Sequence, residues 1–445
     1  MTRAKTLADL TATEAGAKLA SGEITSLALV DACLARIDDL EGDVAAWVYL
    51  DPEHARGQAR EIDRRRSEGE LLPPLAGVPV GIKDIIDTAD MPTQNNCDHF
   101  IGHQPEADAS VVATLRAQGL VIMGKTVTTE LAMRKPGPTR NPLNLEHTPG
   151  GSSSGSAAAV ACGMVPLALG TQTGGSVIRP ASFCGIHAIK PTLGFISRTG
   201  VTLQSHTLDT VGAYARSMDD LRLFLAAMDQ HDATDDVSYP RAASPLAGVE
   251  ERPAFETAPK FAWCRTPSWP QAHKVAQSAL ETFVAGLSFD VPELDLGDGF
   301  GEINDHHTTV QYSENAFHFA GLKKKDPTKL SDEMLQALAV GEATPANRYL
   351  EATMARDPLY RSLDRHLDQY DAIVCLSATG AAPKGISWTG DPIFNGLWTY
   401  LGVPVVSLPL LEVEGLPLGV SLVGKRRGEA RLLAAAAAFE RMVRD

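Results

Sequence analysis

The spacing of hydrophobic side chains changes along the chain and separates regions of helix from regions of strand. Over residues 11–66 apolar side chains recur at helical spacing, and Thr25 or Ser26 is placed to cap the helix over "SLALVDACLARIDDL". From Val78 onward the apolar runs become short and β-branched, and "GVPVGIKDII" is predicted to form a buried strand. The change predicts that helices come first and that a sheet begins near Val78.

Helices and strands alternate through most of the remaining chain. The predicted helices cover "DASVVATLRAQG", which ends at Gly119, then "SAAAVACG" and the late "EARLLAAAAAFERMV". The predicted strands cover "LVIMGKT", "VPLALG", "GIHAIKPT", "YDAIVCLSA", "LGVPVVSLPL" and "LPLGVSLVG". Residues 229–260 are rich in Asp, Pro, Ala and Ser, which indicates an exposed excursion, whereas residues 302–370 return to helical spacing.

This alternation predicts an α/β fold with a single large mixed, mostly parallel β-sheet covered by helices on both faces. No repeat of fixed period and no long linker divides the chain, so we expect one domain over residues 1–445. Within it, the core of the fold is predicted over about 72–225. The helical region over about 229–370 is expected to cover a pocket.

Composition narrows the class of protein. The formal net charge of −15 argues against a nucleic-acid-binding surface, and six scattered cysteines without a C-x-x-C pair favour a reducing compartment. The histidines show no metal-ligand spacing, and no apolar run reaches the length of a membrane span. We therefore expect a cytoplasmic monomer or homodimer that acts on a small molecule, with no metal, cofactor, membrane or nucleic-acid partner.

Two short motifs match known patterns only formally. "GLVIMGKT" fits the phosphate-loop pattern, but its middle residues belong to a buried strand, whereas a phosphate cradle needs free backbone N–H groups in a loop. "GSSSG" fits the nucleophile elbow with Ser153 as nucleophile, but the proline-rich segment before it cannot supply the required strand. A flexible linker is also excluded, because a strong helix former follows at once.

A glycine-rich loop after a predicted strand supplies better chemistry. The backbone N–H groups of "TGGS" can converge as an anion-binding nest beside the hydroxyl of Ser176; the loop consists of Thr173, Gly174, Gly175 and Ser176. Lys83 lies in an apolar strand, where burial favours the neutral amine, a usable base. An ion pair between Lys83 and Asp84 or Asp87 is the alternative that the residues leave open.

Together these residues resemble the amidase signature family. The family's Gly/Ser-rich signature is similar to "PGGSSSGSAAAVACGMVPLALGTQTGGSVIRPASFCGIHAIKPTLG", and its lysine strand is similar to "GVPVGIKDIIDTADMPT". Further matching segments are "GKTVTTELA", "HTLDTVGAYARSMDD" and the stretch from "LGVPVVSLPL" to the last helix. The resemblance covers nearly the whole chain and is weakest between about Asp229 and Tyr370.

The resemblance implies a Ser-cisSer-Lys amidohydrolase without a cofactor. It assigns the nucleophile to Ser176, the bridging serine on a cis peptide to Ser152, the base to Lys83 and the oxyanion hole to the amides of residues 173–176. Ser153 is expected either to support the site by hydrogen bonding or to cap a helix, and Gly151 and Gln172 are expected to lie beside the site. The implied reaction is hydrolysis of linear carbon–nitrogen amide bonds through an acyl-enzyme.

Two residues depart from the family pattern. Gln172 stands where many members have aspartate, and Ile178 followed by Arg179 stands where many place an arginine two residues after the nucleophile. Both changes put the substrate in doubt. The alternatives are the amidase-like subunit of a tRNA-dependent amidotransferase and a catalytically silent binding protein of the same fold.

For the substrate pocket, the sequence offers aromatic and amide side chains. Trp388, Phe394 and Trp398 are concentrated in one late stretch and would favour anilides, aryl carbamates (urethanes) or activated esters beside small amides; the alternative is that they fill the core. Asn95 and Asn96 are candidates for polar contacts at the rim, and Arg179 is a further candidate.

Overall fold

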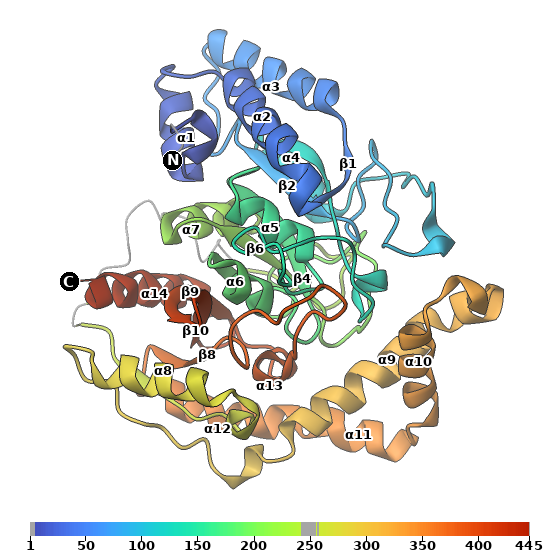
Figure 1. The fold of residues 1–445 in the computed structure, drawn as a ribbon, viewed down its shortest axis with the longest axis vertical. Coiled ribbons are helices and arrows are strands. Elements are labelled where there is room, and N and C mark those ends of the chain that lie inside the picture. Colours follow the sequence, from blue (N-terminus) through green and yellow to red (C-terminus); the bar gives the residue numbers. More distant parts are fainter. Residues whose placement is uncertain (1–4, 242–254, 256–257, 445) are drawn as a thin grey trace.

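One mixed sheet forms the centre of the computed structural model, which describes residues 5–241, 255 and 258–444 (Figure 1). Its ten strands among these residues are β1 (Trp47–Leu50), β2 (Pro79–Lys83), β3 (Val121–Thr126), β4 (Leu167–Gln172), β5 (His187–Lys190), β6 (Thr210–Ala215), β7 (Phe261–Trp263), β8 (Ala372–Leu376), β9 (Val405–Val413) and β10 (Leu416–Val423). Their order across the sheet is β1-β3-β2-β4-β6-β5-β9-β10-β8-β7. The single large mixed sheet is confirmed.

The prediction that the sheet is mostly parallel is wrong. Among the described strands only the pairs β2–β3, β2–β4 and β7–β8 are parallel, and all other neighbours are antiparallel. β6, which the sequence pattern did not predict, accounts for two of the antiparallel pairs. β4 and β5 run in the same direction, as a helix-linked pair should, but β6 lies between them antiparallel to both.

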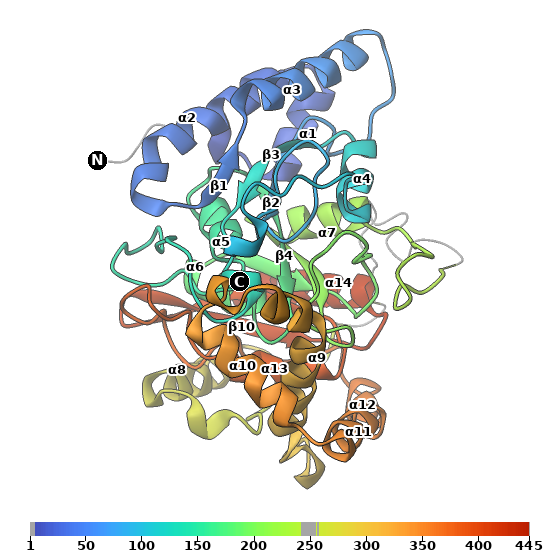
Figure 2. The same ribbon diagram turned by 90° about the vertical axis from the view of Figure 1, so that its right-hand side faces the viewer.

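Helices cover both faces of the sheet, and further helices lie at the two ends of the molecule. They are α1 (Ala12–Ala20), α2 (Ser26–Val44), α3 (Pro52–Ser67), α4 (Ser110–Ala117), α5 (Ser154–Ala161), α6 (Ile178–Cys184), α7 (Met218–Ala227), α8 (Lys274–Ala285), α9 (Ile303–Lys325), α10 (Asp332–Ala343), α11 (Ala346–Met354), α12 (Arg356–Leu367), α13 (Ile393–Tyr400) and α14 (Glu429–Arg444). Figures 1 and 2 show α1–α3 at one end of the molecule and α8–α12 at the other. Thr25 caps α2 by accepting a hydrogen bond from the N–H of Ala28.

Alternating side chains of the strands build two apolar layers. Leu167 and Leu169 of β4 belong to the layer covered by α7, α8 and α14, whereas Ala168 belongs to the layer covered by α5, α6 and α13. The alanine-rich α5 lies against β2, β3 and β4 in the second layer. This packing brings the start of α5 and the start of α6 to one region of the sheet.

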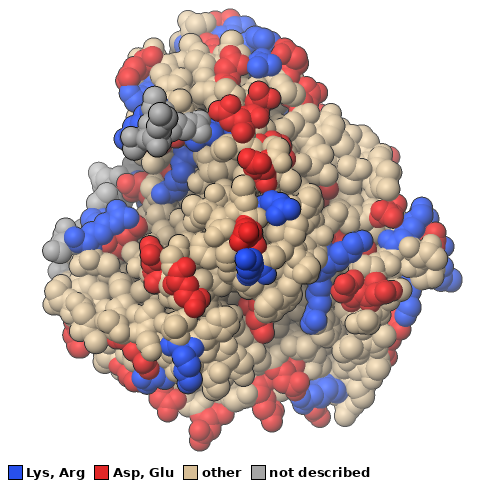
Figure 3. All heavy atoms as spheres, in the orientation of Figure 1, with Lys and Arg blue, Asp and Glu red and all other residues tan. Residues whose placement is uncertain are grey.

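Two predicted regions remain, the helical region over 302–370 and the excursion over 229–260. Residues 302–370 are largely helical, as their spacing predicts, and form α9–α12. The predicted excursion over 229–260 falls partly outside the described residues, which omit 242–254 and 256–257. On the face shown in Figure 3, basic and acidic side chains are interspersed. No described helix is both long enough and apolar enough to cross a membrane.

Candidate active site

Lys83 ends β2 with a side chain that is fully buried. Its Nζ atom lies 2.7 Å from Oγ of Ser152 and 2.8 Å from Oγ1 of Thr171, which is on the adjacent strand β4. Both partners are hydroxyl groups, which can accept a hydrogen bond from an ammonium or donate one to a neutral amine. The lysine is therefore held in contact with one of the predicted catalytic serines.

The surroundings of Lys83 favour its neutral form. Burial lowers the pKa of Lys83 well below its usual value of 10.5, and the charge of Asp209 opposes this effect only in part. The ion pair with Asp84 or Asp87 that the sequence left open is not formed. Asp84 instead lies 3.6 Å from Nζ of Lys125, whose charge also acts on Asp87.

Ser152 lies in a tight loop just before α5. The Gly151–Ser152 peptide bond is cis, and Gly150 has a φ of 84°. A Cβ on Gly150 would lie 2.9 Å from Cα of Pro180, and one on Gly151 would lie 2.7 Å from Cγ2 of Thr389. Glycine is therefore required at both positions, because the loop is pressed between α6 and the segment that holds Thr389.

Ser153 supports this loop from below. Its hydroxyl accepts a hydrogen bond from the N–H of Thr171 at 3.2 Å and donates to the carbonyl of Thr171 at 3.3 Å. Although it occupies the N-cap position of α5, its side chain makes no capping hydrogen bond. Ser153 thus attaches the Ser152 loop to β4. Its role in this structure is to hold the loop, which is one of the two roles expected from the sequence.

Ser176 lies just before α6, next to the loop of Ser152. The two segments are joined by Arg179 of α6, which donates a 2.7 Å hydrogen bond from Nη2 to the carbonyl of Gly151. The hydroxyls of Ser152 and Ser176 are not hydrogen-bonded to each other in this structure. Catalytic hydrogen bonds commonly form only when substrate binds, so the absence of this bond does not exclude a proton relay.

The loop before Ser176 presents unused backbone donors. No hydrogen bond in the described part of the chain takes the N–H groups of Gly174 and Gly175, and a Cβ on Gly175 would lie 3.0 Å from Nδ2 of Asn395. The carbonyl of Gly174 accepts a 2.8 Å hydrogen bond from Oγ1 of Thr399 on α13. Free N–H groups held at adjacent positions are suited to bind an oxyanion.

The hydrogen bonds of Gln172 explain why a glutamine fits where many family members have aspartate. Its Oε1 accepts hydrogen bonds from the N–H groups of Val177 and Ile178, and its Nε2 donates to Oγ1 of Thr399 at 2.9 Å. An ionised aspartate could only accept hydrogen bonds, whereas the amide accepts from the two N–H groups and also donates to Thr399. Gln172 thus links the start of α6 to the residue that holds Gly174.

Asp209 holds the other side of the loop. The hydroxyl of Thr173 donates a 2.5 Å hydrogen bond to Oδ1 of Asp209, and Oδ2 accepts from the N–H groups of Gln204 and Ser205. Burial raises the pKa of Asp209, and these hydrogen bonds offset that rise only in part. The carboxylate therefore fixes the loop and places a negative charge near Lys83.

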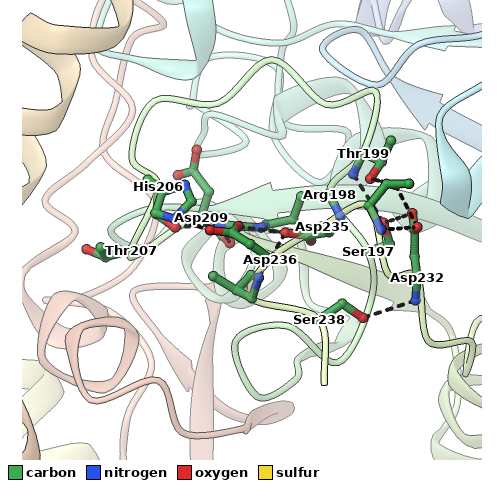
Figure 4. Close-up of polar contacts among 12 residues, drawn as sticks. Ser197, Arg198, Thr199, His206, Thr207, Asp209, Asp232, Asp235, Asp236 and Ser238 are labelled. Atoms are coloured by element: carbon green, nitrogen blue, oxygen red, sulfur yellow. Dashed lines mark hydrogen bonds and ion pairs between the residues drawn. The ribbon is translucent and has the colours of Figure 1, made fainter. Parts of the chain in front are cut away.

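The segment that carries Asp209 is anchored in turn by the chain after α7 (Figure 4). Arg198 forms a buried ion pair with Asp235, with Nη2 2.9 Å from Oδ1, and donates from Nη1 to the carbonyl of His206 at 2.6 Å. Ser197 donates to Asp232 at 2.7 Å. The first part of the predicted excursion is thus packed against the segment that carries Asp209.

A cavity of about 400 Å³ opens beside Ser176. Its wall combines the loop of residues 173–176 and Arg179 with Gln311 and Tyr312 of α9 and the segment around Trp388 and Thr389. Burial lowers the pKa of Arg179 to about 10, so that it remains charged. Trp388 is 56% exposed at this wall.

Four predicted pocket residues lie elsewhere. Phe394 and Trp398 are fully buried in the two apolar layers, and the helix that carries them, α13, packs against α9. Asn95 and Asn96 are not in the wall of the cavity and have φ values of 56° and 47°. Asparagine tolerates this left-handed conformation, so both residues serve a turn.

Sequence reasoning missed Thr171, Asp209 and Thr399. Asp209 lies within "HTLDTVGAYARSMDD", which the resemblance had already singled out, so that segment contained the signal. Thr171 likewise lies within the Gly/Ser-rich signature segment, whereas Thr399 had no signal, because a threonine in an apolar helix is unremarkable. The described residues contain no group of three or more His, Cys, Asp or Glu side chains that could hold a metal ion.

Comparisons with known proteins found similar chains. The family model described as Amidase matches residues 28–294. The A subunit of the glutamyl-tRNA(Gln) amidotransferase of Anaeromyxobacter sp. (strain K) is 34% identical, over 99% of this chain and 97% of that protein. The native peptide amidase from Stenotrophomonas maltophilia is 28% identical with a TM-score of 0.81, over 98% of this chain and 97% of that one.

A third similar chain comes from a structure described as a vestigial protein complex that reveals the evolutionary origins of an s-triazine catabolic enzyme. It is 26% identical to this chain with a TM-score of 0.89, and the match covers 97% of this chain and 98% of that one. All three similarities extend over almost the full length of both proteins compared.

Proposed function

The chain belongs to the amidase family, and from this premise we propose that it cleaves a carbon–nitrogen amide bond through an acyl-enzyme on Ser176. The observation that carries the proposal is the 2.7 Å contact between the buried amine of Lys83 and the hydroxyl of Ser152. Neutral Lys83 takes a proton from Ser152, which takes one from Ser176. The Ser176 oxygen then bonds to the amide carbon.

The remaining steps use the same groups. The N–H groups of Gly174 and Gly175 donate to the oxyanion that develops on the carbonyl oxygen. The proton returns through Ser152 to the amide nitrogen, the carbon–nitrogen bond breaks, and an amine or ammonia leaves. Water then attacks the acyl-enzyme along the same proton path, releasing the acid and restoring the Ser176 hydroxyl.

Covalent labelling tests the assignment of the nucleophile. A fluorophosphonate is expected to phosphonylate Ser176 in the wild-type protein, with the site located by mass spectrometry of proteolytic fragments. Labelling at another serine, or an absence of labelling, would contradict the proposal. An absence of labelling would favour the alternative of a catalytically silent binding protein.

For the biological context, we infer that the chain acts within an amidotransferase complex. Two curated relatives are named as the A subunit of glutamyl-tRNA(Gln) amidotransferase, and they match at 33% and 34% identity along nearly the whole chain. This finding corrects the prediction of a monomer or homodimer that acts on a small molecule without nucleic acid. Neither of these relatives is named for carbamate, urethane or ester cleavage.

Partner dependence tests this inference. The purified chain is expected to release ammonia slowly from a free amide such as glutamine, and at least about tenfold faster once the companion subunits and a glutamyl-tRNA are added. The Ser176→Ala variant is the control for ammonia from other sources. Full-rate hydrolysis of small amides by the chain alone, with no stimulation by partners, would favour a free-standing hydrolase.

The two neighbouring serines provide a matched pair of variants. Ser152→Ala is expected to lower kcat by about 10²–10⁴-fold with little change in KM, because it removes the link between Lys83 and Ser176. Ser153→Ala is expected to cost far less, because its hydroxyl is hydrogen-bonded to the backbone of Thr171 and to Tyr214 and not to Lys83. Steady-state kinetics on one amide decide the order, and a larger loss in Ser153→Ala would reverse the two roles.

The rate is expected to depend on pH in one direction. Protonated Lys83 cannot accept a proton, so kcat/KM falls as the pH drops through the pKa of Lys83 in the folded protein. Burial places that pKa well below 10.5, and activity is full only above it. A profile measured with a non-ionising amide checks this, and a flat profile from acid to alkaline pH would contradict a lysine base.

A further inference from the structure

Helix α9 reaches the oxyanion loop through a histidine that neither the motifs nor the proposed mechanism uses. Nε2 of His307 lies 2.9 Å from the carbonyl oxygen of Thr173. The side chain is buried, and its ring fits against two glycines. A Cβ on Gly396 would lie 3.0 Å from Nδ1, and one on Gly174 would lie 3.6 Å from Cε1. The contact is therefore part of a closely packed arrangement.

The environment fixes the protonation of this ring. A carbonyl oxygen only accepts hydrogen bonds, so Nε2 carries the proton and donates it to Thr173. Burial lowers the pKa of His307 to about 4, with the charge of Arg356 acting in the same direction. The imidazole is therefore neutral near pH 7 and acts as a fixed hydrogen-bond donor.

This contact sets the orientation of a peptide plane. In a trans peptide the carbonyl of one residue and the N–H of the next point in opposite directions. Because His307 holds the carbonyl of Thr173 on the side of α9, the N–H of Gly174 is turned away from α9. Thr399 does the same for the next plane by holding the carbonyl of Gly174. Each donor of the loop thus has its own tether.

We propose that His307 is a positioning residue that aims the N–H of Gly174 at the oxyanion formed during amide cleavage. The inference rests on the proposed role of Ser176. It also gives α9 a second task, because Gln311 and Tyr312 of the same helix line the cavity. The helix that borders the substrate therefore also sets one donor of the oxyanion hole.

A second set of hydrogen bonds, between α9 and the segment that carries Asp209, supports the positioning role of His307. Glu314, two turns after His307, accepts hydrogen bonds from the hydroxyl of Ser205 and from the N–H of Thr207 at 3.0 Å. The N–H of Ser205 in turn donates to Asp209, the carboxylate that holds the hydroxyl of Thr173. α9 therefore fixes Thr173 directly through its carbonyl and indirectly through its side chain.

Three substitutions of His307 and one control test the proposal. His307→Leu removes the donor, and His307→Asn keeps a polar side chain that is too short to reach Thr173. His307→Gln can restore a donor at similar reach. His306→Leu is the matched control, because His306 is the adjacent histidine on α9 and stacks on Tyr400 instead of contacting the loop.

The Leu and Asn variants are expected to lower kcat by about 10–100-fold, somewhat less than the loss of a whole oxyanion donor, with KM changed less than about threefold. His307→Gln should recover most of the rate, and His306→Leu should keep it. The affinity for a trifluoromethyl ketone, which forms a tetrahedral oxyanion adduct with the nucleophile, should fall in step with kcat. Melting temperatures identify folded variants, and the Asn variant carries the test if the Leu variant does not fold.

Unchanged kcat in a folded Leu or Asn variant would overturn the proposal. A loss confined to KM, or equal losses in the Gln and Leu variants, would overturn it as well. Fluorophosphonate labelling of wild-type Ser176 reports on the proposed function separately. A protein that labels at Ser176 but tolerates His307→Leu would keep the nucleophile and lose only the positioning role of His307.

Discussion

Ser176→Ala is expected to abolish amide turnover, with a loss in kcat of about a millionfold that leaves only the contribution of binding and of the oxyanion loop. The hydroxyl of Ser176 makes no hydrogen bond within the described part of the chain, so its removal should leave the fold intact. Ser176 is the residue that comes directly after Gly174 and Gly175, whose N–H groups are free among the described residues, and the next residue, Val177, has no hydroxyl. The residual rate is measured by ammonia release at high enzyme concentration.

Ser182, on the helix α6 that follows Ser176, gives the control for this variant. Ser182 is fully buried on α6, and its hydroxyl accepts a 2.7 Å hydrogen bond from the N–H of Gly419. Ser182→Ala should lower the melting temperature and keep kcat. Ser176→Ala should keep the melting temperature and abolish turnover. Retention of wild-type activity in Ser176→Ala would remove the entire assignment of the site.

Lys83→Ala is expected to impair amide cleavage far more than cleavage of a matched activated ester. An amine leaves only when it is protonated, so an amide needs Lys83 both as a base for Ser176 and as the source of the proton for nitrogen. A nitrophenyl ester expels a stable phenolate and needs only the first step. The ester rate should fall by about 10²–10⁴-fold, and the amide rate by at least about another hundredfold.

The comparison requires an anilide and a nitrophenyl ester with the same acyl group, measured in wild type and in Lys83→Ala. Lys125→Ala is the matched control, because Lys125 is a second buried lysine, on the adjacent β3, and its Nζ contacts Thr93 and Asp84 instead of a catalytic serine. It should reduce stability without changing the ratio of amide to ester rates. Equal losses on both substrates in Lys83→Ala would confine Lys83 to base catalysis, and no loss would remove it from the site.

The parts of the site that follow from sequence are those whose residues lie in continuous motifs. Lys83, Ser152 and Ser176 each occupy a segment whose composition is specific, and packing α5 and α6 on the sheet brings those segments together. The direction of β4 and β5 was also predictable, because a helix links them. β6 was not, because "TVGAYA" is short and follows a loop, and nothing local indicates that it inserts between two earlier strands.

The hydrogen bonds that hold the oxyanion loop could not be predicted from the sequence, for a physical reason. His307 and Thr399 are separated from the residues they hold by 134 and 225 positions, so only the packing of α9 and α13 creates the contacts. The aromatic residues of α13 failed as pocket candidates for a related reason. Phe394 and Trp398 have the composition of a binding surface, but both side chains are fully buried in the core and do not line the cavity.

The double attachment of α9 limits how substrate preference can change in this protein. Gln311 and Tyr312 border the cavity, and exchanging them would be the direct route to accept a different amide. Any exchange that rotates or shifts the helix also moves His307, so specificity and rate are expected to change together. Neutral drift at Gln311 or Tyr312 is thereby restricted to replacements that leave the helix axis in place. Libraries that diversify the cavity should therefore hold His307 and Glu314 constant, and recombination with a relative should transfer α9 together with the loop of residues 173–176.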